Sequence, residues 1–262
     1  MNKNKYTPLI KTLAQVKRSY YLIQIIYQLK KAHSQQDKSL AKKNLPILDS
    51  VENSDIQKIY LDFSEIVRYE PIYVFMFYEA IEFMKEYQFK KDPSVVVAAT
   101  SDTMHLSNQY KNDWEELKKI NLRDHTVRVV KNTIDNIKKS GRAVGSVLPI
   151  LSAFFHDFGK SEHIRNDLLG NSNLVGVKYT PHSEVSKDWL LKVYRDRMFE
   201  LFSDYPEDLK KIDNLIDKIA YIVEKHHMSI SGKTKVENKS SVALVQAMDK
   251  LAREQEIKLL KK

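Results

Sequence analysis

The chain has 262 residues and a mass of 30.6 kDa, enough for one large domain or two small ones with a buried core. Only six glycines and seven prolines are present, so we expect a mainly helical fold and not a β-sandwich or barrel. The absence of cysteine excludes disulfides, thiol nucleophiles and iron–sulfur clusters, so any bound metal must be held by His, Asp or Glu. The net charge of +9 favours an anionic partner, although lysine pairs spread along the chain are also typical of a solvated surface.

Residues 1–110 are predicted to form a helical region whose role the sequence does not indicate. Apolar residues three and four apart predict a helix over residues 8–31, and the polar segment 31–46 is predicted to be a linker. A strongly apolar stretch predicts a buried helix over 72–88 with Pro71 in its first turn, and the β-branched run 94–100 is the one candidate strand. No stretch is apolar for long enough to span a membrane, and the N-terminus lacks a signal-peptide core, so we expect a cytoplasmic protein.

Residues 111–262 are predicted to form a second, all-α domain. A helix is expected from His125 to about Lys139, with Asp124 as its N-cap and Gly141 as its stop. Residues 147–155 are apolar on nearly every face and should lie at the centre of the domain. We expect a loop over 161–181 and further helices over 183–202, 207–225 and 239–259.

Residues that can bind a metal recur near the ends and faces of these predicted helices. Asp157 follows a nearly all-apolar helix, and Asp249 lies near the apolar side of its own helix. A buried carboxylate needs a cation or strong hydrogen bonds, because an unpaired buried charge costs several kcal/mol. Imidazole and carboxylate groups together suit Fe, Mn, Co, Ni and Zn. The candidate set is His125, His156, Asp157, His182, His226, His227 and Asp249.

The order of these residues, with the doublet written HDFGK after LPILSAFF, resembles the HD-domain metal-dependent phosphohydrolase superfamily. The resemblance covers roughly residues 120–255 and implies an HD-domain helical bundle with an N-terminal helical extension. It implies two divalent transition-metal ions, with Asp157 bridging them and Lys160 contacting the substrate phosphate. The implied ligands of the first ion are His125, His156, Asp157 and Asp249, and His182 and His226 complete the second site.

Several other residues near the implied ligands are left with open roles. His227 is expected to contact substrate or support a ligand, because adjacent residues past a helix end rarely point the same way. Arg123, Glu184, Lys187 and Arg253 are close in sequence to implied ligands and are candidates for the same roles, or are simply solvated charges. His163 is expected to be a surface residue in preference to a substrate contact, and His33 and His105 fall outside the match.

The resemblance implies a phosphohydrolase, and the second-metal residues favour cleavage of a phosphodiester bond in a nucleotide or nucleic acid by a metal-activated hydroxide. The chain lacks the GYP tripeptide of the cyclic-di-GMP phosphodiesterase branch. One alternative is a DNA-processing protein similar to the MobH-class relaxases of conjugative elements. A second alternative is a catalytically silent HD-fold binding module. The sequence does not indicate the substrate, the metal or the oligomeric state.

Overall fold

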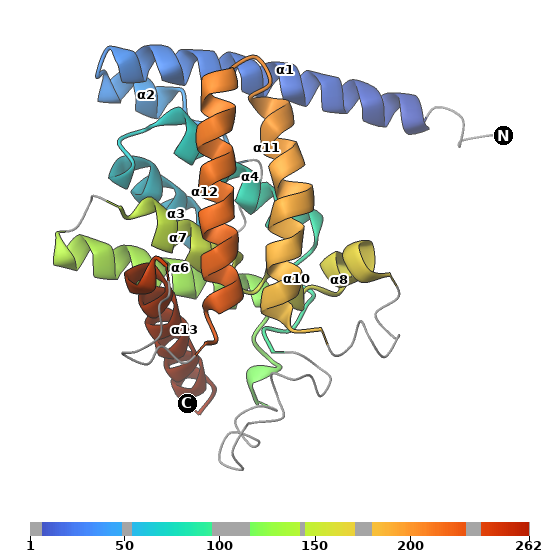
Figure 1. Ribbon diagram of the computed structural model, residues 1–262, viewed down its shortest axis with the longest axis vertical. Helices are drawn as coiled ribbons and strands as arrows, with labels where there is room; N and C mark the ends of the chain where they lie inside the picture. Colours follow the sequence, from blue (N-terminus) through green and yellow to red (C-terminus); the bar gives the residue numbers. More distant parts are fainter. Residues whose placement is uncertain are drawn as a thin grey trace.

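The computed structural model describes residues 7–48, 54–95, 116–141, 145–170, 180–228 and 237–261. Within these ranges the chain is all-α, as predicted, and the only β-type pairing is an isolated bridge between Pro93 and Asn121 (Figure 1). The first half contains α1 (Thr7–Ser34), α2 (Lys38–Lys43), α3 (Ser54–Ile66) and α4 (Pro71–Glu86). The second half contains α6 (Leu122–Ser140), α7 (Val147–Phe155), α8 (Glu162–Leu169), α10 (His182–Trp189), α11 (Arg195–Leu201), α12 (Pro206–Lys225) and α13 (Lys239–Leu260).

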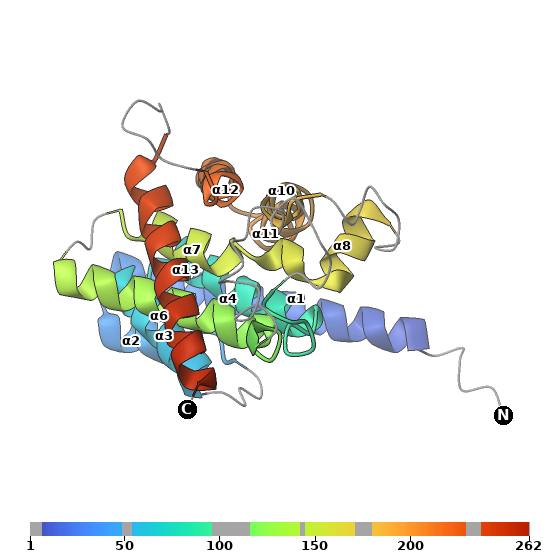
Figure 2. The same cartoon turned by 90° about the horizontal axis from the view of Figure 1, so that it is seen from below.

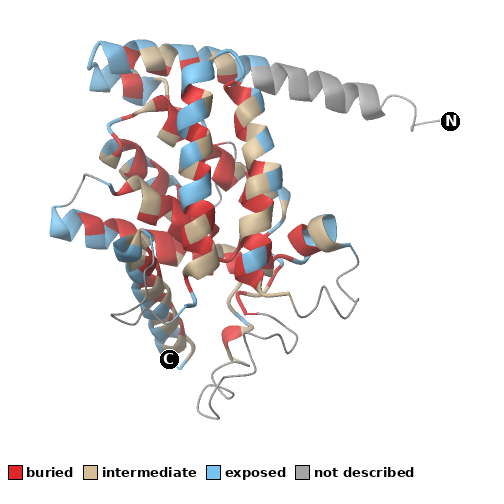
Figure 3. Cartoon of the chain, in the orientation of Figure 1, coloured by how far each residue is buried: buried red, intermediate tan, exposed pale blue. Residues whose placement is uncertain are grey.

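The helix α7 lies at the centre of the bundle, where its apolar sequence predicted it. It packs against α4, α6, α12 and α13, and every residue from Pro149 to Phe155 is buried (Figures 2 and 3). The rings of Phe154 and Phe155 meet Phe77 and Tyr194 edge-on, with centroids 5.1 and 4.7 Å apart. Full burial of one such ring stabilises the fold by about 1.5–3 kcal/mol. This central helix therefore holds its C-terminal end, where His156 and Asp157 follow, in a fixed place.

The predicted N-terminal region shares one core with the rest of the described chain. Buried side chains of α1, α3 and α4 belong to the same apolar cluster as those of α6, α7 and α12. The Tyr194 hydroxyl donates to the Met76 carbonyl oxygen at 2.5 Å, which ties α4 to the helix that runs from α10 into α11. The predicted domain boundary at residue 110 lies outside the described residues, as do His105 and residues 96–100 of the candidate strand. The proposed division into two regions stays a prediction.

Most predicted helices agree with the structure, and their ends follow ordinary capping chemistry. The predicted helix over 183–202 is observed as α10 and α11 joined by a π-helical stretch, Leu190–Tyr194. The N-cap of α6, however, is Asn121 and not the predicted Asp124, since the Asn121 side chain accepts from the Asp124 amide at 2.8 Å. Gly141 ends α6 as predicted and has a φ of +65°, a conformation that glycine adopts without strain.

Two segments predicted to lack regular structure contain short helices. The predicted linker 31–46 contains α2, whose first turn is capped by the Asp37 carboxylate and whose Ala41 is buried. The predicted loop 161–181 contains α8, where Ile164 is fully buried and Arg165 donates to two backbone carbonyls. Both predictions were wrong because capping and tertiary burial stabilise helices too short to show a clear periodicity. Helix α3 was not predicted, although its buried residues Ile56, Ile59 and Phe63 have helical spacing.

The described helices include none that is both long enough and apolar enough to cross a membrane.

Candidate metal centre

Two of the candidate ligand histidines stand at the C-terminal ends of helices and are oriented by the same local contact. His156 follows α7, and its Nδ1 lies 2.8 Å from the Ala153 carbonyl oxygen. His226 follows α12, and its Nδ1 lies 2.5 Å from the Val223 carbonyl oxygen. A carbonyl oxygen only accepts hydrogen bonds, so Nδ1 of each ring carries a proton. Nε2 is then the nitrogen that faces the other side chains of the centre.

Helices α6 and α13 bring two further candidate ligands to the same point. The Nε2 of His125 lies 3.2 Å from Asp249 Oδ1 and 3.3 Å from Asp157 Oδ2. The Nε2 of His156 lies 3.2 Å from the same Asp157 oxygen and 3.8 Å from Asp249 Oδ1. His125, His156 and Asp157 are fully buried, and 19% of the Asp249 side chain is exposed. Two imidazole nitrogens and two carboxylate oxygens from three different parts of the chain thus converge.

The turn after Asp157 places α10, and with it His182, against the same carboxylate. A Cβ added to Gly159 would lie 2.1 Å from the His182 carbonyl oxygen and 2.8 Å from the Ser186 amide nitrogen, so only glycine permits this approach. The Gly159 amide donates to Ser186 Oγ at 2.7 Å, and that hydroxyl lies 3.2 Å from the His156 carbonyl oxygen. The result is that His182 Nε2 lies 3.1 Å from Asp157 Oδ1.

Asp157 belongs to two groups of side chains that can each hold a metal ion. His125, His156 and Asp157 form one group, and Asp157, His182, His226 and His227 form the other. Within each group, one ligand atom from every residue lies within 4.8 Å of all the others. The two oxygens of Asp157 divide between the groups, since Oδ2 faces His125 and His156 and Oδ1 faces His182.

The hydrogen bonding of these side chains also fits a metal site. The Nε2 atoms of His125, His156 and His226 are buried without a well-directed hydrogen bond to any described residue, as are Oδ1 of Asp157 and Oδ1 of Asp249. Buried polar atoms are nearly always hydrogen-bonded, and an unsatisfied one costs about 1–3 kcal/mol. Five such atoms in one place, all of them metal-ligand types, are explained by a shared cation. The donor set therefore fits a divalent transition-metal ion.

The charges at the centre divide four of its five histidines into two classes. Burial lowers the pKa of His156, but the Asp157 and Asp249 carboxylates outweigh it and raise that pKa to about 9. For His125, burial and Arg253 lower the pKa, and the Asp157, Asp249 and Glu256 carboxylates raise it above its ordinary value. Burial raises the pKa of both aspartates, yet the facing histidines hold each well below its usual range. This half of the centre therefore ionises as imidazolium–carboxylate pairs.

Two further histidines, His226 and His227, are held neutral. Burial, together with the neighbouring His227, holds the pKa of His226 well below its ordinary value. The His227 residue is exposed overall, but its ring is partly removed from water where it meets His182, and this desolvation together with His182 lowers its pKa to about 4. Neutral imidazole is the form that binds metal, so neither His226 nor His227 needs to lose a proton before it can act as a ligand. His227 is exposed, and its Nε2 lies 2.9 Å from that of His182, so both members of the HH pair reach the centre.

Two cations lie beside the shared carboxylate. Lys160 Nζ lies 2.6 Å from Asp157 Oδ2, and Arg253 Nη2 lies 3.7 Å from the same oxygen. Arg253 also donates to the hydroxyl and the carbonyl oxygen of Ser94, at 2.8 and 2.7 Å. Ser94 comes from the end of the segment that follows α4, so the predicted N-terminal region contributes to the surroundings of the centre.

Glu256 is part of the site, and the sequence reasoning missed it. Its side chain is fully buried on α13, with Oε1 2.9 Å from His125 Nδ1 and 2.7 Å from Arg128 Nη1. Arg253 Nη1 lies 3.1 Å from its other oxygen. A carboxylate on the far nitrogen of a ligand histidine orients the ring and increases its basicity. The available signal was the seven-residue spacing from Asp249, which puts both acids on one face of the helix.

The remaining residues considered from the sequence lie away from this cluster. Arg123 pairs with the neighbouring Asp124 at 2.7 Å, and Lys187 pairs with Glu224 at 2.8 Å. Glu184 is exposed on α10, and His163 is exposed on α8, as expected for a surface histidine. The candidate supporting roles of Arg123 and Glu184 thus gain no contact from the structure.

No model of a known protein family matches this chain. Comparison with curated proteins gives no match. Comparison with solved structures gives none either. The all-α fold of the described residues and the buried His/Asp clusters that can bind metal are therefore observations on this structure, without support from a similar protein.

Proposed function

We propose that the protein is a metal-dependent phosphohydrolase of the HD-domain type that cleaves a phosphodiester bond. The observation that carries the proposal is the sharing of Asp157 between two groups of metal-capable side chains, one on each of its oxygens. A carboxylate in this position can bridge two ions, which is the arrangement of dinuclear hydrolases. The order of the ligand residues along the chain and the HDFGK doublet support the same reading.

The residues divide into roles according to their contacts. His125, His156, Asp157 and Asp249 would hold one ion, and Asp157, His182 and His226 would hold the other. Divalent ions bound there supply Lewis acidity, which lowers the pKa of water and offsets the negative charge that builds on a phosphoryl group. Glu256 holds the His125 ring in place through Nδ1.

The cations at the centre support an anionic substrate. Lys160 and Arg253 place two positive charges beside Asp157, and 9% and 19% of their side chains are exposed. Each can therefore donate a hydrogen bond to a phosphate oxygen that approaches the centre. Lys160 would do so with a compact ammonium group, and Arg253 with a planar guanidinium group. His227, exposed and uncharged near neutral pH, stands at the same edge and can donate or accept one hydrogen bond.

Metal content tests the proposal first. Protein purified without chelator should contain about two transition-metal ions per chain by elemental analysis. Asp157→Asn should retain one ion or none, because the bridging charge is lost, whereas Asp135→Asn, an exposed aspartate on α6, should match wild type. Absence of metal in wild type, in the purified protein and after incubation with Mn²⁺, Fe²⁺ or Zn²⁺, would refute the hydrolase and leave the silent binding module.

Hydrolysis of a chromogenic phosphodiester, bis(p-nitrophenyl) phosphate, tests the chemistry separately. We expect turnover that depends on added metal, is lost in His182→Gln, and is retained in the matched surface variant His163→Gln. Single-stranded DNA, RNA and cyclic dinucleotides then distinguish substrate classes, because binding to a nucleic acid weakens steeply as salt rises. Metal-loaded protein that hydrolyses none of these phosphodiesters would contradict the proposed reaction.

A further inference from the structure

A concave site lies at the other end of α7 and α12 from the metal centre. It is a pocket of about 770 Å³ between the first turn of α7, the first three turns of α12 and the connection from α3 to α4. His156 and His226 follow the opposite, C-terminal ends of α7 and α12. Its volume is within the range of about 300–1,000 Å³ that is typical of small-molecule sites. The proposed hydrolase chemistry uses none of its residues.

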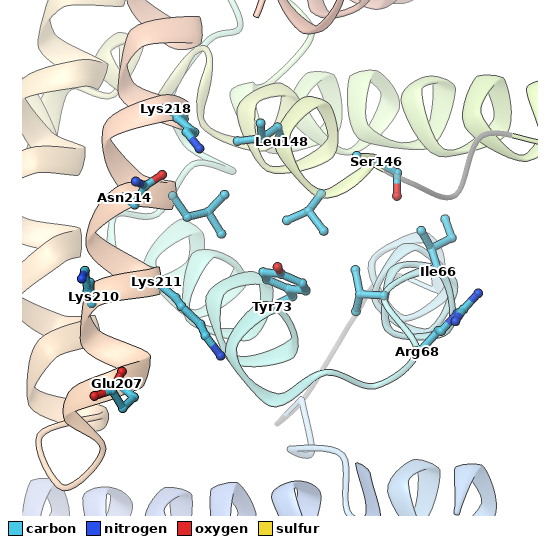
Figure 4. A pocket seen from close by; sticks show the side chains of 14 residues that line it. Ile66, Arg68, Tyr73, Ser146, Leu148, Glu207, Lys210, Lys211, Asn214 and Lys218 are labelled. Carbon is cyan, nitrogen blue, oxygen red and sulfur yellow. The ribbon is translucent and has the colours of Figure 1, made fainter. Parts of the chain in front are cut away.

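The inner surface of the pocket is apolar and contains one aromatic ring. Tyr73 of α4 stands in the middle of the pocket, with Leu148 of α7 above it (Figure 4). Tyr73 is half-buried, so part of its ring remains accessible. Asn214 of α12 adds a side-chain amide at the wall (Figure 4). A flat aromatic group can stack on an accessible ring, and an amide can hydrogen-bond to its edge.

The rim of the pocket is strongly cationic. Arg68, Lys210, Lys211 and Lys218 line it together with a single acid, Glu207. In Figure 4, Lys211 and Lys218 both lie on the α12 side of Tyr73, with Lys218 above the level of the ring and the end of Lys211 below it.

Some exposed lysines of the described residues have an ion-pair partner and others, such as Lys42 and Lys43, have none. Lys85, Lys119 and Lys138 each form an ion pair of 2.5–2.7 Å with a neighbouring carboxylate. No described residue forms an ion pair with Lys210, Lys211 or Lys218. Lys210, Lys211 and Lys218 are exposed and available to an anion, and a phosphate group placed among the rim cations would gain favourable charge–charge interactions.

We propose that this pocket binds a nucleoside phosphate. The cations on the rim match a phosphate group, and the apolar interior with Tyr73 and Asn214 matches a flat heteroaromatic base. The first turn of α7 also favours a bound anion, because the amides of Val147 and Leu148 are at the positive end of the helix dipole. The Ser146 side chain does not cap this end. The proposal does not depend on the metal centre and stands if the hydrolase proposal fails.

Titration of the full-length protein with a fluorescent N-methylanthraniloyl derivative of ATP tests this site, with EDTA present so that metal-dependent binding is excluded. We expect saturable binding in wild type and a Kd about tenfold weaker in Lys211→Gln/Lys218→Gln. The matched control Lys42→Gln/Lys43→Gln removes the same charge from exposed positions on α2 and should bind as wild type. Tyr73→Leu should weaken binding about fivefold or more through lost stacking. Thermal melting shows whether each variant is folded.

Competition and hydrogen exchange complete the test. Unlabelled ATP should displace the probe at least tenfold more effectively than inorganic tripolyphosphate or adenosine, because the site binds both parts of the ligand. ATP should slow amide exchange in residues 146–150 and 206–218 without slowing it in 182–189. Equal binding by wild type and the Lys211→Gln/Lys218→Gln variant would overturn the proposal. So would competition by tripolyphosphate as strong as that by ATP, or exchange protection confined to 182–189.

Discussion

Removal of the Glu256 charge offers a direct test of how the metal centre is held together. Glu256→Gln keeps the size of the side chain and one acceptor oxygen but removes the negative charge. In the structure that charge is fully buried, and it faces His125 Nδ1 at 2.9 Å and the guanidinium groups of Arg128 and Arg253 at 2.7 and 3.1 Å. Burial raises the pKa of Glu256, but His125 and Arg253 hold it below its ordinary value, so the group is ionised at neutral pH.

The size of the effect follows from these contacts. Removal of one partner from a buried charged pair costs about 3–5 kcal/mol. Here 24% of the Arg128 side chain and 19% of the Arg253 side chain are exposed and can regain water. We therefore expect the variant to lose about 2–3 kcal/mol of unfolding free energy, which corresponds to about 4–10 °C in Tm for a chain of this size. Metal affinity should fall about 10- to 100-fold, because the His125 ring loses the group that orients it.

Guanidinium denaturation with EDTA measures the stability, and competition with a metal-sensitive dye measures the affinity. Glu254→Gln is the matched control, since this neighbouring glutamate on α13 is exposed. Measuring both quantities separates a loss of stability from a loss of metal. The reasoning is refuted if Glu256→Gln and Glu254→Gln show the same unfolding midpoint and the same metal affinity.

Three further predictions follow from the same geometry. Gly159→Ala should lose about 3 kcal/mol of stability and most of its metal, because its Cβ would lie 2.1 Å from the His182 carbonyl oxygen; Gly141→Ala, with open space around it, should lose only about 1 kcal/mol by thermal melting. In chelator-treated protein, the raised pKa of His156, about 9, contributes stability that is complete below the unfolded pKa of about 6.5 and is lost as pH rises through 9. The lowered pKa of Asp157 contributes stability that is present above about pH 4 and is lost on acidification; a pH-independent unfolding midpoint between pH 6 and 10 would contradict the imidazolium–carboxylate pairing. Zn²⁺ binding at pH 7 should release protons, because His156 must lose one, and calorimetry in buffers of different ionisation enthalpy would disprove this by showing no release.

Local sequence signals were sufficient for most of the helices. The helices α1, α4, α7, α12 and α13 agree with their predicted ranges within a few residues, because each has a long apolar face or an all-apolar run. The short helices α2 and α8 were not predictable in this way. Their stability comes from a capping side chain or from burial against other elements, and neither has a periodic signature over so few residues.

The candidate ligands were recognisable from residue type and order, but their arrangement was not. The sequence indicated that Asp157 and Asp249 are acids in apolar settings, and that a cation would compensate them. Only the tertiary structure shows His125 from α6 and Asp249 from α13 within 3.2 Å of each other, and Asp157 with one oxygen toward each group of histidines. The physical reason is that side-chain distances between helices depend on packing angles and close approaches, such as that at Gly159, which no local pattern encodes. Glu256 illustrates the same limit, since its position on α13 was visible in the sequence, whereas its contact with His125, 131 residues away, exists only in the folded chain.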